Sequence, residues 1–238
     1  MSNEKQLFKI FNELYNRLLK EEFIIDKSGV KLLELIGKKI ELDPSQPLLD
    51  FTVKKSNKDY INKELNWYKS QNLSILGYMD DITIWNNVAD SYGDIISNYG
   101  WMIYSSANYN QYSRCLNELI NNKESRRAVM IYQRPSMWLE YNTFGKNDFC
   151  CTDGVQCFIR DNKLLYISKQ RSQDAIFGFF NDFAWHCYVY DQLYSDLQVH
   201  YPNLEYDKIW HFPFSFHIYE RHFLLLEKLI LINKGIYE

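Results

Sequence analysis

The residues of this sequence that are best suited to chemistry lie between Cys151 and Asp182. Cys151–Gln156 reads CTDGVQ and Arg171–Asp174 reads RSQD, and Gly178 stands four residues before Asp182. A cysteine before one strand, an Arg-Ser pair at the end of the next strand and a polar residue at the start of a helix can converge on one pocket. A nucleophilic thiolate requires a nearby cation that lowers the thiol pKa. Arg171 can supply that charge and can also hold a phosphate, because a guanidinium pairs with two phosphate oxygens at once.

This pattern indicates covalent thiolate catalysis, and the alternative is that Cys151 is a buried structural thiol. The five cysteines are an odd number and show no CxxC spacing, which argues against a disulfide framework and against a zinc site. We therefore expect reduced thiols and no metal.

The composition limits the class of protein. The chain has 238 residues, of which 46% are hydrophobic and 24% charged, as expected of a single globular domain over residues 1–238 with a sizeable core. The net charge of −3 includes no basic excess, which excludes general DNA binding. Residues 1–22 are typical of a charged amphipathic helix rather than a signal peptide, and no apolar run is long enough to span a bilayer. We expect a cytoplasmic protein that does not enter a membrane.

The spacing of apolar residues predicts helices and strands that are interspersed without regular βαβ alternation. The predicted helices cover 4–21, 58–70, 108–121, 178–199 and 219–232. The predicted strands cover 30–41, 126–133, 154–160, 163–170 and 207–218. Asp161-Asn162 is the predicted turn between 154–160 and 163–170. This mixture favours an α+β fold, in which helices pack on a large sheet.

The order of the motifs resembles the thymidylate synthase family. The Cys151–Gln156 and Arg171–Asp182 motifs are joined by six further matches, which are Tyr60–Tyr68 with Glu64 inside it, Ile84-Trp85, Ala89-Asp90, Tyr99-Gly100, Ser125–Arg127, and His217–His222. The matches extend from about residue 24 to residue 223. The resemblance implies a thymidylate synthase-like fold with a large mixed β-sheet and packed helices, a homodimer, and 5,10-methylenetetrahydrofolate as co-substrate.

The resemblance also implies a role for each site residue. Cys151 adds to the pyrimidine ring, and Glu64 organises water and transfers protons, although an exposed helix face is the commoner place for a glutamate. The phosphate of the nucleotide is bound by Arg171 and Ser172 of the same subunit, by Lys27, and by Arg126 and Arg127 of the partner. The ribose contacts His217 and Tyr219, and the folate contacts Asp174 and Trp85.

Four stretches are most similar to the bacteriophage branch of this family, which hydroxymethylates deoxycytidylate. They are ELNWYKS (64–70), SNYGW (97–101), SRRAVMIYQRPSM (125–137) and GFFNDFAW (178–185). Thr152 stands where the family usually has His, and Asp182 stands where it usually has Asn. A carboxyl group suits cytosine, because it can accept from the ring's amino group or, when protonated, donate to N3. Two alternatives remain for this position: Asp182 caps a helix, or a slip of one residue makes Asn181 the base-binding residue.

The resulting hypothesis is that Cys151 adds to C6 of dCMP and that water completes a hydroxymethyl group at C5. The alternatives are a C5 methyltransferase acting on dUMP or dCMP, and a relative that binds nucleotide or RNA without turnover. The chain ends at INKGIYE soon after the last predicted helix. We expect so short a tail to shield the site less from water, in keeping with a hydroxymethyl product.

Overall fold

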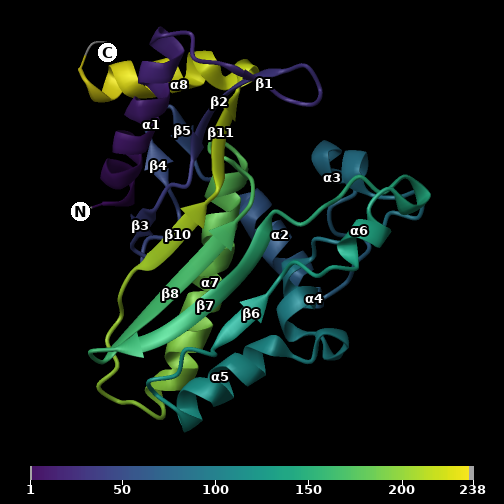
Figure 1. Ribbon diagram of the computed structural model, residues 1–238, viewed down its shortest axis with the longest axis vertical. Helices are drawn as coiled ribbons and strands as arrows, with labels where there is room; N and C mark the ends of the chain where they lie inside the picture. The colour runs from purple at the N-terminus through teal and green to yellow at the C-terminus, as the bar shows by residue number, and fades with distance from the viewer. Residues whose placement is uncertain (1, 236–238) are drawn as a thin grey trace.

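The computed structural model describes residues 2–235, in which helices pack against a bent β-sheet (Figure 1). The α-helices are α1 (Asn3–Leu19), α2 (Lys58–Ser70), α3 (Thr83–Val88), α4 (Tyr99–Tyr104), α5 (Gln111–Asn121), α6 (Met137–Glu140), α7 (Gly178–Gln198) and α8 (Phe223–Asn233). The strands are β1 (Ile24–Ile25), β2 (Lys31–Ile36), β3 (Ile40–Leu42), β4 (Asp50–Phe51), β5 (Lys54–Lys55), β6 (Val129–Ile131), β7 (Thr152–Arg160), β8 (Lys163–Gln170), β9 (Gln173–Asp174), β10 (Ile209–Pro213) and β11 (Ser215–Tyr219). Of the described helices, none is long and apolar enough to cross a membrane.

Nine of the strands form a five-stranded sheet, β3-β10-β8-β7-β6, and a four-stranded sheet, β1-β2-β11-β9, while β4 and β5 pair with each other. The two larger sheets are mixed, because β8 and β10 pair in parallel, as do β9 and β11, while the other pairs are antiparallel. Three chain segments run from one sheet into the other. Backbone hydrogen bonds bridge the gap, with Phe214 N donating to Gln170 O (2.7 Å) and Gly37 N donating to Phe214 O (2.9 Å). The two sheets are therefore one bent surface, which confirms the predicted large mixed sheet.

The bend corrects two of the predicted strands. Residues 30–41 form β2 and β3, and residues 207–218 form β10 and most of β11, each pair divided at the bend. Gly37 has φ +66°, a conformation that a glycine adopts without steric cost and that ends an extended strand. A long run of strand-forming residues does not reveal such a break.

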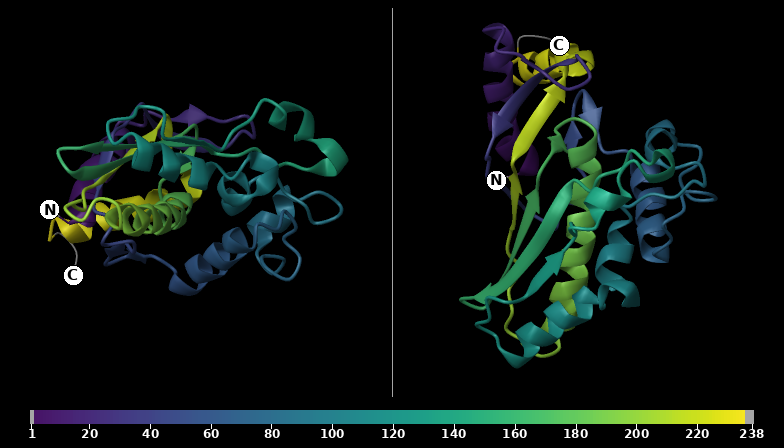
Figure 2. Two further views of the ribbon diagram at one scale, coloured as in Figure 1. Left: turned by 90° about the horizontal axis from the view of Figure 1, so that it is seen from below. Right: turned by 45° about the vertical axis from the view of Figure 1, so that its right-hand side comes forward.

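Helix α7 runs along one face of the five-stranded sheet (Figures 1 and 2). Alternate side chains of β8, such as Tyr166 and Ser168, are buried on this side. The Tyr190 hydroxyl on α7 donates to Leu164 O (3.0 Å), which ties the helix to the sheet. On the opposite face, within residues 2–235, no helix covers β7, β8 and β10 (Figure 2). Their side chains there are only partly buried.

The long helices and the longest hairpin begin and end within a few residues of their predicted bounds. Helices α1, α2, α5 and α7 are confirmed, as is the β7–β8 hairpin, whose turn residues Asp161 and Asn162 both have positive φ, at 50° and 58°. Strand β6 is shorter than predicted, and α8 begins at Phe223 because Glu220–His222 form a single 3-10 turn. Helices α3 and α4 were not predicted, since six residues are too few to show a helical period.

Helix α4 packs closely on α2 through a glycine. A Cβ atom added to Gly100 would lie 1.8 Å from the backbone oxygen of Tyr68. The two helices can approach this closely because position 100 has no side chain.

We therefore predict that Gly100→Ala lowers the free energy of unfolding by about 3 kcal/mol, because α4 has to move away from α2. Urea denaturation followed by far-UV circular dichroism measures this. Asn62→Ala, on the exposed side of α2, is the matched control and should change stability by less than about 0.5 kcal/mol. Equal stability of Gly100→Ala and the wild type would contradict the close approach.

Candidate active site

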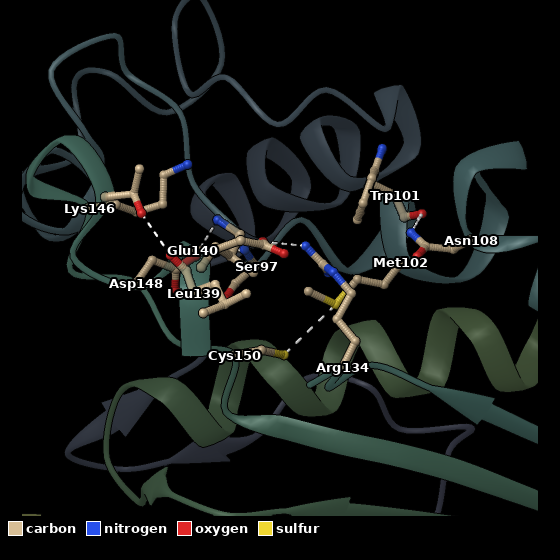
Figure 3. A network of polar contacts seen from close by, with 12 residues as sticks. Ser97, Trp101, Met102, Asn108, Arg134, Leu139, Glu140, Lys146, Asp148 and Cys150 are labelled. Atoms are coloured by element: carbon tan, nitrogen blue, oxygen red, sulfur yellow. Dashed lines mark hydrogen bonds and ion pairs between the residues drawn. The ribbon is translucent and has the colours of Figure 1, made fainter. Parts of the chain in front are cut away.

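The two cysteines before β7 point in different directions. Cys150 is fully buried, and its Sγ lies 3.8 Å from Met102 Sδ and donates to the carbonyl oxygen of Thr152 (3.2 Å) (Figure 3). Cys151 is partly exposed. The pairing of β7 with β8 shifts register between Thr152 and Gly154, a bulge of the kind that re-aims a side chain. Cys151 is therefore the more accessible of the two thiols.

Arg171 holds the cysteine loop in place from the bend between β8 and β9. Its Nη2 donates to Phe149 O (2.6 Å), and its Nε donates to Cys150 O (2.9 Å). The same Nη2 lies 3.7 Å from Cys151 Sγ. The Arg171 backbone N also donates to Cys151 O (2.9 Å). The structure thus brings the predicted cation to the predicted nucleophile.

The pKa of the Cys151 thiol reflects opposing effects. Burial raises it to about 11, and the positive charge of Arg171 opposes this rise. Negative charge on Asp182, Asp148 and Asp153 raises it further. Arg171 is thus the neighbour that favours the thiolate, and the surrounding carboxyl groups favour the thiol.

A buried carboxylate joins the cysteine loop to the segment before α4. Asp148 accepts hydrogen bonds from Ile96 N (2.6 Å), Ser97 N (2.6 Å) and Ser97 Oγ (2.7 Å) (Figure 3). This contact brings Tyr99 toward the site, where burial and then the charge of Asp182 raise its pKa well above the ordinary value. Tyr99 had no role in the sequence analysis, although it lies in the matched stretch SNYGW.

Asp182 lies one turn into α7, on the side that faces the bend. Its Oδ2 accepts hydrogen bonds from Gln173 Nε2 (2.8 Å) and Gln170 Nε2 (2.9 Å). Burial raises its pKa, and the two glutamine amides oppose that rise. Helix α7 begins at Gly178, so Asp182 is its fifth residue and does not cap it. Asn181 is partly exposed and lies about 100° away around the helix. The glutamine contacts therefore distinguish Asp182 from its neighbour.

Glu64 lies on the buried side of α2 and is only 5% exposed, so the alternative of an exposed glutamate is wrong. Its Oε1 accepts a hydrogen bond from the Tyr60 hydroxyl (2.9 Å), which in turn accepts one from Trp85 Nε1 (2.9 Å). Burial, followed by the charge of Asp182, raises the pKa of Glu64 to about 8. A carboxyl group with this pKa exchanges protons near neutrality.

His217 and Tyr219 lie two residues apart on β11, and their ring centres are 5.0 Å apart. His217 stands opposite Asp174 in the parallel β9–β11 pair. Burial lowers the pKa of His217, which favours the neutral ring. Asp174 Oδ1 accepts from Ile176 N (2.8 Å) and Phe177 N (3.0 Å), just before α7 begins. The two predicted ribose residues and one predicted folate residue are thus neighbours.

Asp174 and Trp85 are the predicted folate contacts. Trp85 reaches Glu64 through Tyr60, and the charge of Asp174 acts on the pKa of both Asp182 and His217. An indole and a carboxylate near the reactive groups fit a planar pteridine with N–H donors. Among residues 2–235, no three His, Cys, Asp or Glu side chains gather as metal ligands.

Arg126 and Arg127 do not meet Cys151 within one subunit. Both are exposed before β6, where the Arg126 carbonyl accepts from Gln156 Nε2 (2.9 Å) and Arg127 forms an ion pair with Glu118 (3.0 Å). The step of five positions along the strand from Cys151 to Gln156 spans about 16 Å. Lys27 lies in an exposed turn between β1 and β2. Burial and the charge of Asp174 raise the pKa of Tyr219, and the charge of Asp26, the neighbour of Lys27, adds to this rise.

Comparison with known proteins agrees with the geometry. The sequence model of the family described as thymidylate synthase matches residues 9–234. The deoxycytidylate 5-hydroxymethyltransferases of Enterobacteria phages T6 and T4 are each 45% identical to the chain over 214 residues, which cover 88% of this chain and 85% of the relative. A thymidylate synthase of Francisella philomiragia is 26% identical over 165 residues, which cover 64% of this chain and 60% of the relative.

We predict that iodoacetamide labels Cys151 before the other four cysteines, which are buried. Because the pKa of Cys151 is about 11, its labelling rate should rise about tenfold per pH unit between pH 7 and 9. Mass spectrometry of tryptic peptides locates the label. Arg171→Met should slow labelling at fixed pH, because it removes the charge that favours the thiolate. Faster labelling of Cys150 than of Cys151 would contradict this assignment.

Proposed function

The chain belongs to the thymidylate synthase family, and we propose that it converts dCMP, 5,10-methylenetetrahydrofolate and water to 5-hydroxymethyl-dCMP and tetrahydrofolate. The observation that carries this proposal is the half-buried Asp182 carboxyl group, which two glutamine amides hold near Cys151. The phage relatives named deoxycytidylate 5-hydroxymethyltransferase, which share 45% identity with the chain, support the same reaction.

Asp182 is suited to cytosine in either protonation state. Both glutamine bonds end on Oδ2, and within residues 2–235 no hydrogen bond reaches Oδ1, so Oδ1 is the atom that can meet a base. An ionised Oδ1 accepts from the amino group of cytosine, and a protonated one donates to N3. Uracil presents an oxygen in place of the amino group and an N–H in place of the N3 acceptor. Each state therefore meets a mismatched partner on uracil.

The reaction begins when the Cys151 thiolate adds to C6 of the pyrimidine, which makes C5 nucleophilic. The folate supplies a one-carbon unit at the oxidation level of formaldehyde. Once that unit is attached, C5 loses its proton, the bond from the unit to the folate nitrogen breaks, and tetrahydrofolate leaves an exocyclic methylene group on the ring. Glu64, with a pKa of about 8, orients the attacking water and accepts its proton. The ring then expels Cys151 as C5 regains aromatic character, and the hydroxymethyl group remains.

The other residues position the two substrates. Arg171 and Ser172 bind the phosphate of dCMP, with Lys27 as a further contact across the site. His217 and Tyr219 hold the deoxyribose. Asp174 and Trp85 hold the folate, whose one-carbon unit then lies near Glu64 and C5. We place this activity in the cytosol, which is the host's if the chain is viral.

The enzyme acts as a homodimer in which Arg126 and Arg127 bind the phosphate in the partner's site. The face of the sheet opposite α7 supports this, because it carries a row of partly buried side chains across all five strands. In register, this row is Glu41, Trp210, Ile167, Gln156 and Val129. Phe158, Leu165 and Phe212 add apolar area beside it. A second copy would bury this face and would bring its exposed arginines across.

The reaction itself is tested by incubating the wild type with dCMP or dUMP and methylenetetrahydrofolate. We expect 5-hydroxymethyl-dCMP by liquid chromatography and no rise in dihydrofolate absorbance, because water rather than hydride reaches the methylene group. Cys151→Ala should lower turnover at least about a thousandfold, while Cys150→Ala should retain it. Formation of dihydrofolate would identify a methyltransferase, and full activity of Cys151→Ala would remove the covalent mechanism.

The shared site is tested by mixing two inactive variants, Cys151→Ala and Arg126→Ala/Arg127→Ala. Random exchange makes half of the dimers hybrid, and each hybrid holds one intact site, so activity should recover to about one quarter of the wild-type value. Activity is measured before and after the subunits exchange in mild denaturant. A mixture that stays inactive, although exchange is verified by mass spectrometry, would show that the arginines serve their own subunit.

A further inference from the structure

A chain of buried polar side chains lies behind Asp182. Gln173 Oε1 lies 3.0 Å from His211 Nε2, and His211 Nδ1 lies 2.7 Å from Ser168 Oγ. None of these three residues is more than 2% exposed. They come from three strands, β8, β9 and β10, at the bend of the sheet. The chain connects the interior of the sheet to Asp182 Oδ2 through Gln173 Nε2.

The direction of these hydrogen bonds is fixed by a backbone carbonyl. Gln170 Nε2 donates to Ser172 O (3.3 Å), which can only accept, and this sets the orientation of the Gln170 amide. The same Nε2 donates to Asp182 Oδ2, so this oxygen is an acceptor. Gln173 must then also present its Nε2 to Oδ2, because its amide oxygen would face another acceptor there. Its Oε1 is consequently turned toward His211.

The His211 ring sets the direction of the two remaining hydrogen bonds. Burial, and then the nearby His186, lower its pKa well below the ordinary value, so the ring is neutral and has one donor and one acceptor. Its Nε2–H donates to Gln173 Oε1, and its Nδ1 accepts from the Ser168 hydroxyl. Every bond from Ser168 to Asp182 therefore points the same way, and each donor meets an acceptor.

We propose that Gln173 and His211 are positioning residues that hold the Asp182 carboxyl group with Oδ1 toward the base, and that they thereby set the preference for cytosine over uracil. This inference rests on the proposed function. With both lone pairs of Oδ2 occupied by amide protons, the recognition atom is Oδ1 in both protonation states. Any proton on Asp182 is likewise on Oδ1, where it faces N3 of the ring.

Without the His211 donor, the Gln173 amide is free to turn its oxygen toward Asp182. Two acceptors would then face each other at Oδ2, and the carboxyl group would rotate away. Gln170 alone does not define the plane of the carboxyl group, because a single hydrogen bond leaves rotation about it. The base would meet a carboxyl group of variable orientation, and discrimination between amino and carbonyl substituents would fall.

The test compares two variants of similar size at one position. His211→Leu removes the donor, whereas His211→Gln places an amide N–H near the position of the ring Nε2. Calorimetric titration without folate gives the dissociation constants for dCMP and dUMP, and Asp182→Asn marks the loss of the carboxyl group. We expect the dUMP-to-dCMP ratio of dissociation constants to fall about tenfold in His211→Leu, the effect of one buried hydrogen bond. In His211→Gln it should stay within about threefold of wild type.

If the role of His211 were purely structural, His211→Leu would lower the unfolding temperature, or weaken the binding of both nucleotides alike, without changing the ratio of their dissociation constants. An unchanged ratio in His211→Leu, or an equal loss in His211→Gln, overturns the proposal. If His211→Leu does not fold, Gln173→Met removes the same link and should also lower the ratio about tenfold. If neither variant folds, these hydrogen-bonded side chains serve stability, and the proposal is also overturned. A wild type without preference for dCMP would instead reject the proposed function, which separates the two failures.

Discussion

The arrangement of the site depends on the guanidinium of Arg171. It donates to the carbonyl oxygens of Phe149 and Cys150 and lies against the sulfur of Cys151, so one rigid planar group holds the whole cysteine loop. Arg171 can do this because it stands where the sheet bends, between β8 and β9. A lysine could not replace it, since one ammonium group has no fork to span two carbonyls and a thiol. The bend therefore has a chemical role as well as an architectural one.

The carboxyl groups of the site oppose the effect of the Arg171 charge on the pKa of Cys151. Burial raises the pKa of Glu64, Asp182 and Asp148, and the charges of Asp182 and Asp148 oppose the thiolate of Cys151. Each of these groups is held by hydrogen bonds that limit the cost of burial. Asp148 uses both carboxylate oxygens to join two loops. Asp182 receives its hydrogen bonds within residues 2–235 on Oδ2 alone, which leaves Oδ1 for the proposed contact with the base.

One face of the five-stranded sheet packs against the core of the subunit, and the side chains on the other face are only partly buried. Helix α7 covers the first and carries Asp182 to the bend, so the packing of the core also places the residue that we propose recognises the base. The second side presents aromatic and aliphatic residues of β7, β8 and β10 that no described helix covers. In the proposed dimer this side also delivers the arginines that lie too far from Cys151 in their own chain.

The sequence alone determined the long helices, the β7–β8 hairpin and the membership of Cys151, Glu64, Arg171 and Asp182 in one site. These follow from local periodicity, from turn residues and from an ordered set of motifs, all of which can be read along the chain. It did not show the division of 30–41 and 207–218 into separate strands, or the short helices α3 and α4. The hydrogen bonds from Gln170 and Gln173 to Asp182, the direction of Cys150 and the contact between Gln173 and His211 were decided by the tertiary structure. The physical reason is that each depends on partners from distant segments, which meet only when the sheet bends and α7 packs against it.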